Sequence, residues 1–343
     1  MHEPYRPRQS TAPSAAEPSE QAAPGALLRT VAGELSPSVV DGPVLAHEHL
    51  ALDLSRESDT TAVLGPDHRE PVAVELAELR GTYGLSLVVE LTCRGMGRDV
   101  PALAEISRRS GVHVVTATGW YYERFHPRDI ASLSETELTD LLVRDIREGI
   151  GSTGVRPGVI GEVGSHGDEP SSAENRTLSA AARAAVATGL SVATHAQLGR
   201  GGLAQLDLLT RAGVPPHRIS IGHQDLLDDP AVHRELAAAG AYVALDTVGK
   251  ESYQSDRTRL RLLLALLEAG HADRVLLSCD VSRFGYLRSE GGTGYGHLFR
   301  SFLPQVRAAG ADEEIIDLLT RRNPLRFLAG GDNRTDQPDS EEP

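Results

Sequence analysis

The chain has 343 residues and a formal net charge of −14; 40% of its residues are hydrophobic and 24% are charged. This composition is that of a folded globular protein, and the length suits either one large α/β barrel or two smaller domains. The acidic balance, without any run rich in Lys or Arg, argues against nucleic acid or an anionic membrane as the main partner.

Both ends of the chain are polar and show no periodicity. Residues 1–25 are rich in Pro, Ser, Ala and Glu, and residues 330–343 form an acidic segment. Because such segments bury too little apolar surface to offset the entropy of ordering, both are predicted to be disordered tails. The two cysteines, Cys93 and Cys279, cannot build a disulfide framework, and no segment has the apolar character of a signal peptide or a membrane span, which predicts a cytoplasmic protein.

Between residues 26 and 329, short apolar runs alternate with longer amphipathic segments. Eight runs have the character of strands: residues 39–47, 85–92, 112–119, 158–164, 190–195, 219–223, 241–246 and 274–280. Helical segments follow them, for example residues 99–111, 135–149, 173–189, 202–213, 229–240 and 257–270, and several stop at a glycine in the position of a left-handed C-cap. Apolar strands separated by helices indicate a parallel sheet covered on its outside, and eight units predict a (β/α)8 TIM barrel. A doubly wound open sheet is the alternative, but no strand is followed by a nucleotide-binding glycine motif.

Five of these runs end in residue types that bind metals. The six candidate ligands are His47, His49, Glu162, His195, His223 and Asp280. Barrel enzymes carry their chemistry at the carboxyl ends of the strands, so these side chains are predicted to converge there. Residues two apart on a strand point to the same face, which turns His47 and His49 toward the barrel axis and Glu48 away from it.

Four imidazoles and two carboxylates are too many ligands for one tetrahedral catalytic ion with an open position. They suit two divalent ions, with zinc as the first candidate and manganese, cobalt or iron as alternatives, which share a bridging carboxylate and a bridging hydroxide. One histidine at a strand end is usually a structural hydrogen-bonding group. That interpretation does not account for six ligand types in the register of a barrel.

The sequence around these residues resembles the phosphotriesterase family of the amidohydrolase superfamily, over residues 26–329. The resemblance lies in the segments LAHEHL (45–50), CRGMGRDVPAL (93–103), TATGWYY (116–122), IGEVG (160–164), THAQLGRGG (194–202), IGHQDLLDD (221–229), SCDVS (278–282), GGTGYGHLFRSFLPQVRAAG (291–310) and NPLRFLA (323–329). It implies that His47, His49 and Asp280 bind the more buried metal. It also implies that His195 and His223 bind the more exposed metal, with Glu162 as the bridge. The best-known members have a carbamylated lysine as the bridge, so the chain resembles the glutamate-bridged subgroup of phosphotriesterase homology proteins.

The resemblance implies a metal-dependent hydrolase of ester bonds, in which a hydroxide between two metals attacks a lactone, a carboxylic ester or a phosphoester. Asp280 is the candidate to accept and relay the proton of the hydroxide. The expected partner is a small-molecule ester, and a homodimer is compatible with the family. Two alternatives stay open. A TatD-like metal-dependent nuclease is disfavoured by the net charge, and a barrel that binds a ligand without turnover is disfavoured by the complete ligand set.

Candidate substrate-binding residues follow the third, seventh and eighth runs. They are Trp120, Tyr121, Tyr122, Lys250 and Arg283. The aromatic residues are predicted to line the wall of the pocket. Lys250 is the only lysine of the chain and lies beyond the seventh run, so the fourth run cannot carry a carbamylated lysine. Lys250 is interpreted either as a contact for an anionic substrate group or as a solvated loop charge.

Overall fold

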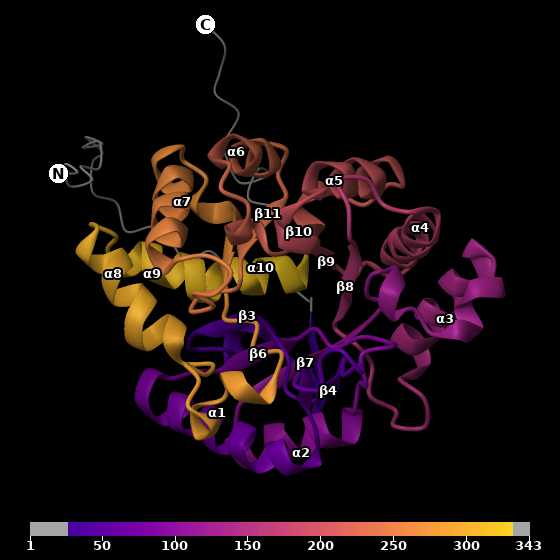
Figure 1. Ribbon diagram of the computed structural model, residues 1–343, viewed down its shortest axis with the longest axis horizontal. Helices are drawn as coiled ribbons and strands as arrows, with labels where there is room; N and C mark the ends of the chain where they lie inside the picture. Colours follow the sequence, from indigo (N-terminus) through magenta and orange to yellow (C-terminus); the bar gives the residue numbers. More distant parts are fainter. Residues whose placement is uncertain (1–26, 332–343) are drawn as a thin grey trace, which may run out of the picture.

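The computed structural model describes residues 27–331, and a parallel barrel forms its centre (Figure 1). Eight strands pair in sequence order, each parallel to the next. They are β3 (Val44–Glu48), β6 (Leu87–Glu90), β7 (His113–Thr118), β8 (Val159–Ser165), β9 (Val192–Ala196), β10 (Ile219–Ile221), β11 (Tyr242–Leu245) and β12 (Val275–Leu277). Each predicted run coincides with one of these strands, so the prediction of a TIM barrel is confirmed. The predicted tails, residues 1–25 and 330–343, lie outside the described residues except for Gly330 and Gly331.

Helices surround the strands on their outer side (Figure 1). They are α1 (Arg69–Tyr83), α2 (Val100–Ser110), α3 (Glu135–Glu148), α4 (Ser172–Thr188), α5 (Gly202–Arg211), α6 (Pro230–Ala238), α7 (Asp256–Glu268), α8 (Leu303–Ala308), α9 (Glu313–Asp317) and α10 (Asn323–Ala329). Ser134 and Ser171 cap α3 and α4, because each hydroxyl accepts a hydrogen bond from a backbone N–H of the first turn. Gly111 and Gly189 end α2 and α4 in the predicted left-handed conformation. None of the helices within residues 27–331 has the length and apolar character needed to cross a membrane.

Two short antiparallel pairs accompany the barrel. They are β1 (Leu28–Thr30) with β2 (Gly33–Leu35), and β4 (Leu52–Asp53) with β5 (Val63–Leu64). The first pair adjoins the beginning of β7, since Val31 N–H donates to the carbonyl of Val114 at 2.9 Å. The second pair follows β3 and therefore lies beyond the carboxyl ends of the strands.

Apolar side chains from alternate strand residues fill the inside of the barrel. They are Val44, Ala46, Leu87, Val89, Leu91, Val115, Ala117, Val159, Ala193, Tyr242, Ala244 and Leu276. Phe327 of α10 packs against this cluster. Ser191, just before β9, donates to the Phe327 carbonyl at 2.5 Å, and Asn323 Nδ2 donates to the carbonyl of Val275 at the start of β12 at 2.8 Å. Helix α10 thus closes the amino-terminal end of the barrel, which leaves the carboxyl end for a ligand.

Two strands break the alternation of inward and outward residues. The pairing of β3 with β6 shifts in register between Leu45 and Glu48, and the pairing of β8 with β9 shifts between Ile160 and Val163. Strict alternation from the first residues of these strands would turn Glu48 inward and Glu162 outward. The register shifts reverse both directions, as β-bulges do. A bulge therefore aims a candidate ligand at the barrel axis in each strand.

Glu48 joins the last strand of the barrel to the first. Its carboxylate accepts hydrogen bonds from the backbone N–H groups of Cys279 and Val281, at 2.8 Å each. Asp280 N–H donates to the carbonyl of His47 at 3.3 Å across the same seam. Burial raises the pKa of Glu48 to about 7 against the effect of these donors. The prediction that Glu48 points away from the axis is confirmed, and its carboxylate closes the barrel.

Candidate metal centre

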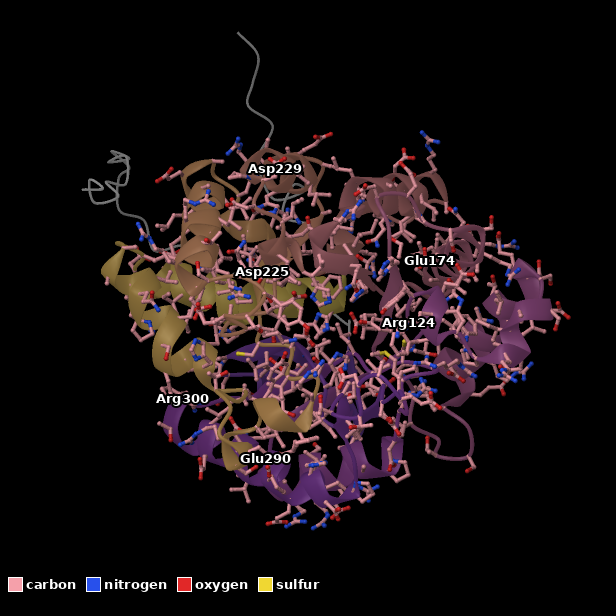
Figure 2. All side chains as sticks on the ribbon, viewed as in Figure 1. Arg124, Glu174, Asp225, Asp229, Glu290 and Arg300 are labelled. Atoms are coloured by element: carbon pink, nitrogen blue, oxygen red, sulfur yellow. The ribbon has the colours of Figure 1, made fainter. Side chains whose placement is uncertain are left out.

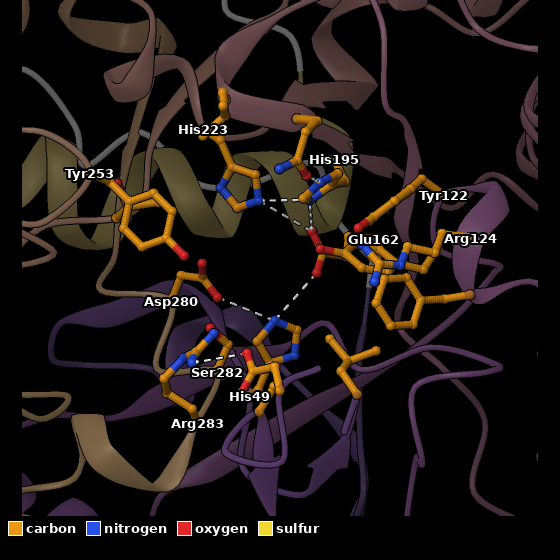
Figure 3. Close-up of a pocket in the computed structure, with 18 of the residues that line it drawn as sticks. His49, Tyr122, Arg124, Glu162, His195, His223, Tyr253, Asp280, Ser282 and Arg283 are labelled. Carbon is orange, nitrogen blue, oxygen red and sulfur yellow. Dashed lines mark hydrogen bonds and ion pairs between the residues drawn. The ribbon is translucent and has the colours of Figure 1, made fainter. Parts of the chain in front are cut away.

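The structure brings all six candidate metal ligands together at the carboxyl end of the barrel. They come from β3, β8 and β9 and from the turns after β10 and β12. Each residue is buried, with an exposed fraction of 7% or less. Figure 3 shows the side chains of His49, Glu162, His195, His223 and Asp280 pointing into one common space.

Glu162 lies between two groups of histidines. Its Oε1 is 3.3 Å from His49 Nε2, while its Oε2 is 3.0 Å from His195 Nδ1 and 3.5 Å from His223 Nε2. His49 Nε2 also lies 3.3 Å from Oδ1 of Asp280. Two compact sets of ligand atoms could each hold one ion, namely those of His47, His49 and Asp280 and those of Glu162, His195 and His223, and Glu162 also contacts the first set through His49. This is the arrangement that a bridging carboxylate requires.

Asp246 supports both groups and is absent from the predicted ligands. Its Oδ2 accepts a hydrogen bond from His47 Nδ1 at 2.7 Å, and its Oδ1 accepts one from His223 Nδ1 at 2.9 Å. One carboxylate therefore orients an imidazole from each group. The ligand spacing skips the seventh strand, which is why the sequence did not point to Asp246. The sequence could have indicated Asp246, because it is the last residue of the seventh apolar run and carboxylates at strand ends are candidate site residues.

The outer partners of the four imidazoles fix which ring nitrogen carries the hydrogen. The pairs are His47 Nδ1 with Asp246 Oδ2 (2.7 Å), His223 Nδ1 with Asp246 Oδ1 (2.9 Å), His49 Nδ1 with Thr92 Oγ1 (2.9 Å) and His195 Nε2 with Gln197 Oε1 (2.8 Å). The hydroxyl of Thr92 itself donates to Glu90 at 2.5 Å, so it accepts from His49. Each neutral imidazole consequently turns a lone pair toward the centre of the site.

The inward lone pairs lack protein donors. His195 Nδ1 and His223 Nε2 lie 2.8 Å apart, and both atoms carry lone pairs when the two imidazoles are neutral. His47 Nε2 is buried without a hydrogen-bond partner among the described residues. Lone pairs that face one another in a buried site repel unless a cation lies against them. The donor set therefore fits divalent metal ions.

The site also carries an excess of negative charge. Three buried carboxylates, Glu162, Asp246 and Asp280, surround it, and one ammonium, that of Lys250, opposes them. Burial acts to raise the pKa of Glu162, but the neighbouring imidazoles outweigh it and hold this pKa well below its usual value. Burial acts to lower the pKa of His223, but Asp246 and Glu162 raise it to about 10. The pocket therefore attracts positive charge, which two divalent ions would supply.

Two of the ligands adopt a backbone conformation that is rare outside glycine. The φ angle is 57° at His223 and 50° at Asp280. Such left-handed residues cost about 1–3 kcal/mol each and cluster at functional sites, where the surrounding structure enforces them. His223 lies two residues after β10 and Asp280 three residues after β12, and the left-handed turn directs each side chain into the site.

Lys250 is not a solvated loop charge. Its side chain is 9% exposed, and its ammonium contacts Asp280 Oδ2 and lies 3.2 Å from Ser282 Oγ. Burial acts to lower the pKa of Lys250, but Asp280 outweighs it and the pKa lies above its usual value. The loop after β11 curls back over the site, which the sequence pattern alone did not show.

A cavity of about 360 Å³ opens above the ligands, a size that suits a small molecule. Tyr121 and Tyr122 line it and pack on His195, with ring centroids 4.5 and 5.4 Å from the imidazole. Lys250 and Arg283 line it as well. Four of the five predicted substrate-binding residues thus reach the cavity.

Trp120 and Asp225 lie away from this cavity. Trp120 is 1% exposed and does not line it; its indole packs in the layer between barrel and helices, 5.9 Å from the guanidinium of Arg94. The reason is that Trp120 continues the strand direction in a bridge with Arg94 and so turns outward. Asp225 is buried, and its carboxylate accepts hydrogen bonds from the backbone N–H of Asp246 at 3.2 Å and from Arg259 Nε at 2.6 Å. It therefore fixes the position of Asp246.

The fold and this site together define a class of protein. A (β/α)8 barrel that joins two groups of buried histidines and carboxylates at its carboxyl end is typical of metal-dependent barrel hydrolases. Residues 26–328 match the model of the phosphotriesterase family, and the chain belongs to this family. The predicted family is confirmed, with Glu162 between the histidine groups in place of a modified lysine.

Three relatives illustrate the similarity. The phosphotriesterase homology protein of Escherichia coli is 37% identical over 84% of this chain and 98% of its own length. Its crystal structure, complexed with phosphate in the active site, matches with a TM-score of 0.81 and 36% identity over 84% of this chain and 99% of that one. The N-acetyltaurine hydrolase of Salmo salar is 30% identical over 83% of this chain and 81% of its own. A mutant of a phosphotriesterase-like lactonase from Deinococcus radiodurans matches with a TM-score of 0.78 and 33% identity over 88% of this chain and 99% of that one.

Proposed function

We propose that the protein hydrolyses an ester bond of a small molecule with the help of two divalent ions, for which zinc is the first candidate and manganese, cobalt and iron are alternatives. The observation that carries the proposal is the convergence of four imidazoles and two ligand carboxylates, five of which line a cavity of about 360 Å³. His47, His49 and Asp280 would hold one ion, His195 and His223 the other, and Glu162 both. Bound there, such ions lower the pKa of a water molecule toward about 7 and polarise a carbonyl or phosphoryl oxygen.

The protein's own groups would divide the remaining work. Asp280 turns Oδ1 toward His49 and Oδ2 toward Lys250, so its carboxylate is ionised and lies beside the other proposed ligands. We assign to it the acceptance of a proton from the attacking water. Tyr121 and Tyr122, 9% and 8% exposed, would exclude bulk water and pack against the substrate.

The names of the relatives favour some kinds of cleaved bond over others. The named activities of the lactonase from Deinococcus radiodurans and of the N-acetyltaurine hydrolase both act at a carbonyl carbon, which favours a lactone or carboxylic ester over a phosphoester. The second of these names makes a carboxylic amide the other candidate. The phosphate in the active site of the Escherichia coli structure keeps the phosphoester in the test.

The test is metal analysis combined with a substrate panel. The purified protein is assayed for bound metals, stripped with a chelator, and reloaded with zinc, manganese, cobalt or iron. Each form is then offered lactones, 4-nitrophenyl carboxylic esters, phosphoesters, N-acetyltaurine and DNA. We expect two metal equivalents per chain and ester hydrolysis that is lost on stripping and restored on reloading. A loaded protein that cuts only DNA would establish the nuclease alternative, and one that binds panel compounds but cleaves none would establish a ligand-binding barrel.

A further inference from the structure

We propose that Arg56 and Arg124, at the rim of the cavity, bind an anionic group on the non-reacting end of the substrate. The substrate would then be an ester that carries a carboxylate, sulfonate or phosphate some distance from the bond that is cleaved. This proposal rests on the proposed function, because that function places the cleaved bond at the metal ligands. Nothing in the metal centre itself requires such a group.

The two arginines meet over one aromatic ring. Arg56 lies in the turn after β4, and Arg124 lies in the short 3₁₀ turn Glu123–Phe125 beyond β7. Arg56 Nη2 donates to the backbone carbonyl of Arg124 at 2.9 Å. The guanidinium carbons of Arg56 and Arg124 lie 4.5 and 6.0 Å from the ring centroid of Phe125, and all three residues line the cavity. Both guanidinium carbons therefore lie within 6.0 Å of the centroid of one ring at the rim of the cavity, where planar donor groups can bind an anion.

These two guanidinium groups are not neutralised by the protein. Four cationic side chains line the cavity, and two of them already have carboxylate partners: Lys250 contacts Asp280, and Arg283 Nη1 is 3.2 Å from Asp59 Oδ2. Within residues 27–331, the other two cations form no ion pair with a carboxylate. Two adjacent positive charges repel each other, and a bound anion would relieve that repulsion.

The acidic side chains on this side of the molecule make other bonds. Glu174, which lies on the same side as Arg124 (Figure 2), accepts hydrogen bonds from the backbone N–H groups of His166 at 3.1 Å and Glu123 at 3.2 Å. Glu123 Oε2 accepts from the hydroxyl of Ser171 at 2.6 Å. The chain as a whole carries a net charge of −14. Two arginines without carboxylate partners at the mouth of the cavity therefore have a charge opposite to that of the whole protein. A positive rim on an acidic protein selects anions locally.

Tyr122 packs between the rim of the cavity and the candidate metal ligands. Its ring stacks on His195 with 5.4 Å between centroids and 11° between planes. On its other side, its ring centroid is 5.1 Å from that of Phe125, the ring over which the Arg56 guanidinium lies. Figure 3 shows Tyr122 and Arg124 on the side of the cavity opposite Asp280. Tyr122 thus lies between the candidate ligand His195 and Phe125, the ring that carries the two arginines.

The experiment compares two esters that differ only in a terminal charge, 4-nitrophenyl hexanoate and mono-4-nitrophenyl adipate. In the metal-loaded enzyme we expect R56A/R124A to raise the KM for the adipate ester about tenfold or more, because an exposed charge-assisted contact to each arginine is lost. The KM for the hexanoate ester should change less than about twofold, and kcat should change little for both. Equal changes for the two esters, or none for either, would overturn the proposal.

A binding measurement separates failure of this subsite from failure of the proposed function. Titration calorimetry with hexanoate and with adipate needs no turnover, and both acids offer one carboxylate to the metals. Adipate should bind more tightly than hexanoate to the wild type, and R56A/R124A should abolish that difference. If no ester is hydrolysed but the difference persists, the reaction is wrong and the subsite stands; if adipate gains nothing, the subsite is wrong. Matched sulfonate and phosphate compounds then identify the preferred anion. R211A is the control, since it removes one positive charge from the exposed face of α5, where the Arg211 side chain is 79% exposed.

Discussion

Lys250, the only lysine of the chain, places its ammonium against the outer oxygen of Asp280. The inner oxygen of the same carboxylate faces His49 Nε2 at 3.3 Å. Burial acts to raise the pKa of Asp280, but Lys250 and then His49 lower it below the usual range, so the carboxylate is ionised throughout the physiological pH range. We therefore propose that Lys250 positions the carboxylate of Asp280.

Replacement of Lys250 should affect turnover more than metal binding. K250M removes the charge partner of Asp280 Oδ2 and leaves a buried carboxylate oxygen unsatisfied, so we expect kcat to fall about 10–100-fold, the loss typical of one buried charge-assisted contact. K250R keeps the charge and should retain more of the activity. Steady-state kinetics and metal analysis of both variants check this, and an unchanged kcat in K250M would contradict the positioning role.

The carboxylate of Asp280 should be needed for turnover and less for metal binding. D280N keeps an oxygen that can ligate a metal but loses the ability to accept a proton, so we expect kcat to fall about 10²–10⁴-fold while most of the metal stays bound. Metal content and kcat are measured on the same preparation. Because Asp228 is exposed and pairs with Arg261 on the surface, D228N is a control of the same chemistry that should keep full activity. A D280N enzyme with more than half of the wild-type kcat would rule out Asp280 as the proton acceptor.

Asp246 should control metal affinity, because it orients His47 and His223 together. In D246N a single carbonyl oxygen can serve only one of the two imidazoles, while the amide N–H groups face the other donor. Loss of such an outer partner typically lowers metal affinity about 10–100-fold. Competition with a chromophoric chelator measures the change. The control is D207N, on the exposed part of α5, and equal affinities of D246N and wild type would show that Asp246 does not orient the ligands.

The sequence predicts the eight strands well, because each is an apolar run that ends at a turn residue or a polar ligand. It predicts the direction of some ligands for the same reason. His195 lies two residues beyond the inward Ala193, so simple alternation brings it to the axis. Glu162 and His47 reach the axis only through register shifts in β8 and β3, and a bulge depends on pairing with the next strand rather than on local sequence.

The rim of the cavity could not be predicted in the same way. Arg56 follows the first barrel strand and Arg124 follows the third, and only the folded loops place both over Phe125. Loop conformations depend on tertiary contacts, so sequence position alone predicted both Trp120 and its neighbour Tyr121 to bind the substrate. The alternating direction of successive side chains after β7 separates them: one packs against the helices, and the other lines the cavity.

The last prediction concerns the dependence of stability on pH and a group outside the metal centre. Asp256, at the start of α7, accepts hydrogen bonds from Gly249 N–H at 2.9 Å and Arg259 Nη1 at 3.0 Å, and its Oδ2 is 2.7 Å from His297 Nε2. Burial acts to raise the pKa of Asp256, but the bonds from His297 and Gly249 outweigh it and lower the pKa below its usual value. A carboxyl group with a lowered pKa in the folded state stabilises the fold above its unfolded pKa, about 3.9 for Asp, and that stability is lost as the pH falls through the lower folded value.

D256N should therefore lower the free energy of unfolding by about 1–3 kcal/mol at pH 7 and by no less at pH 5, because Asp256 is ionised in both states of the wild type and a proton on His297 can only strengthen their bond. Below about pH 3.9 the difference should shrink, since the unfolded wild type then binds a proton that the folded form resists. Urea unfolding of wild type and D256N at pH 7.0, 5.0 and 3.5 measures the difference, and any release of metal at low pH affects both proteins alike. A difference that does not shrink between pH 5.0 and pH 3.5 would mean that the ionised carboxylate of Asp256 does not stabilise the fold.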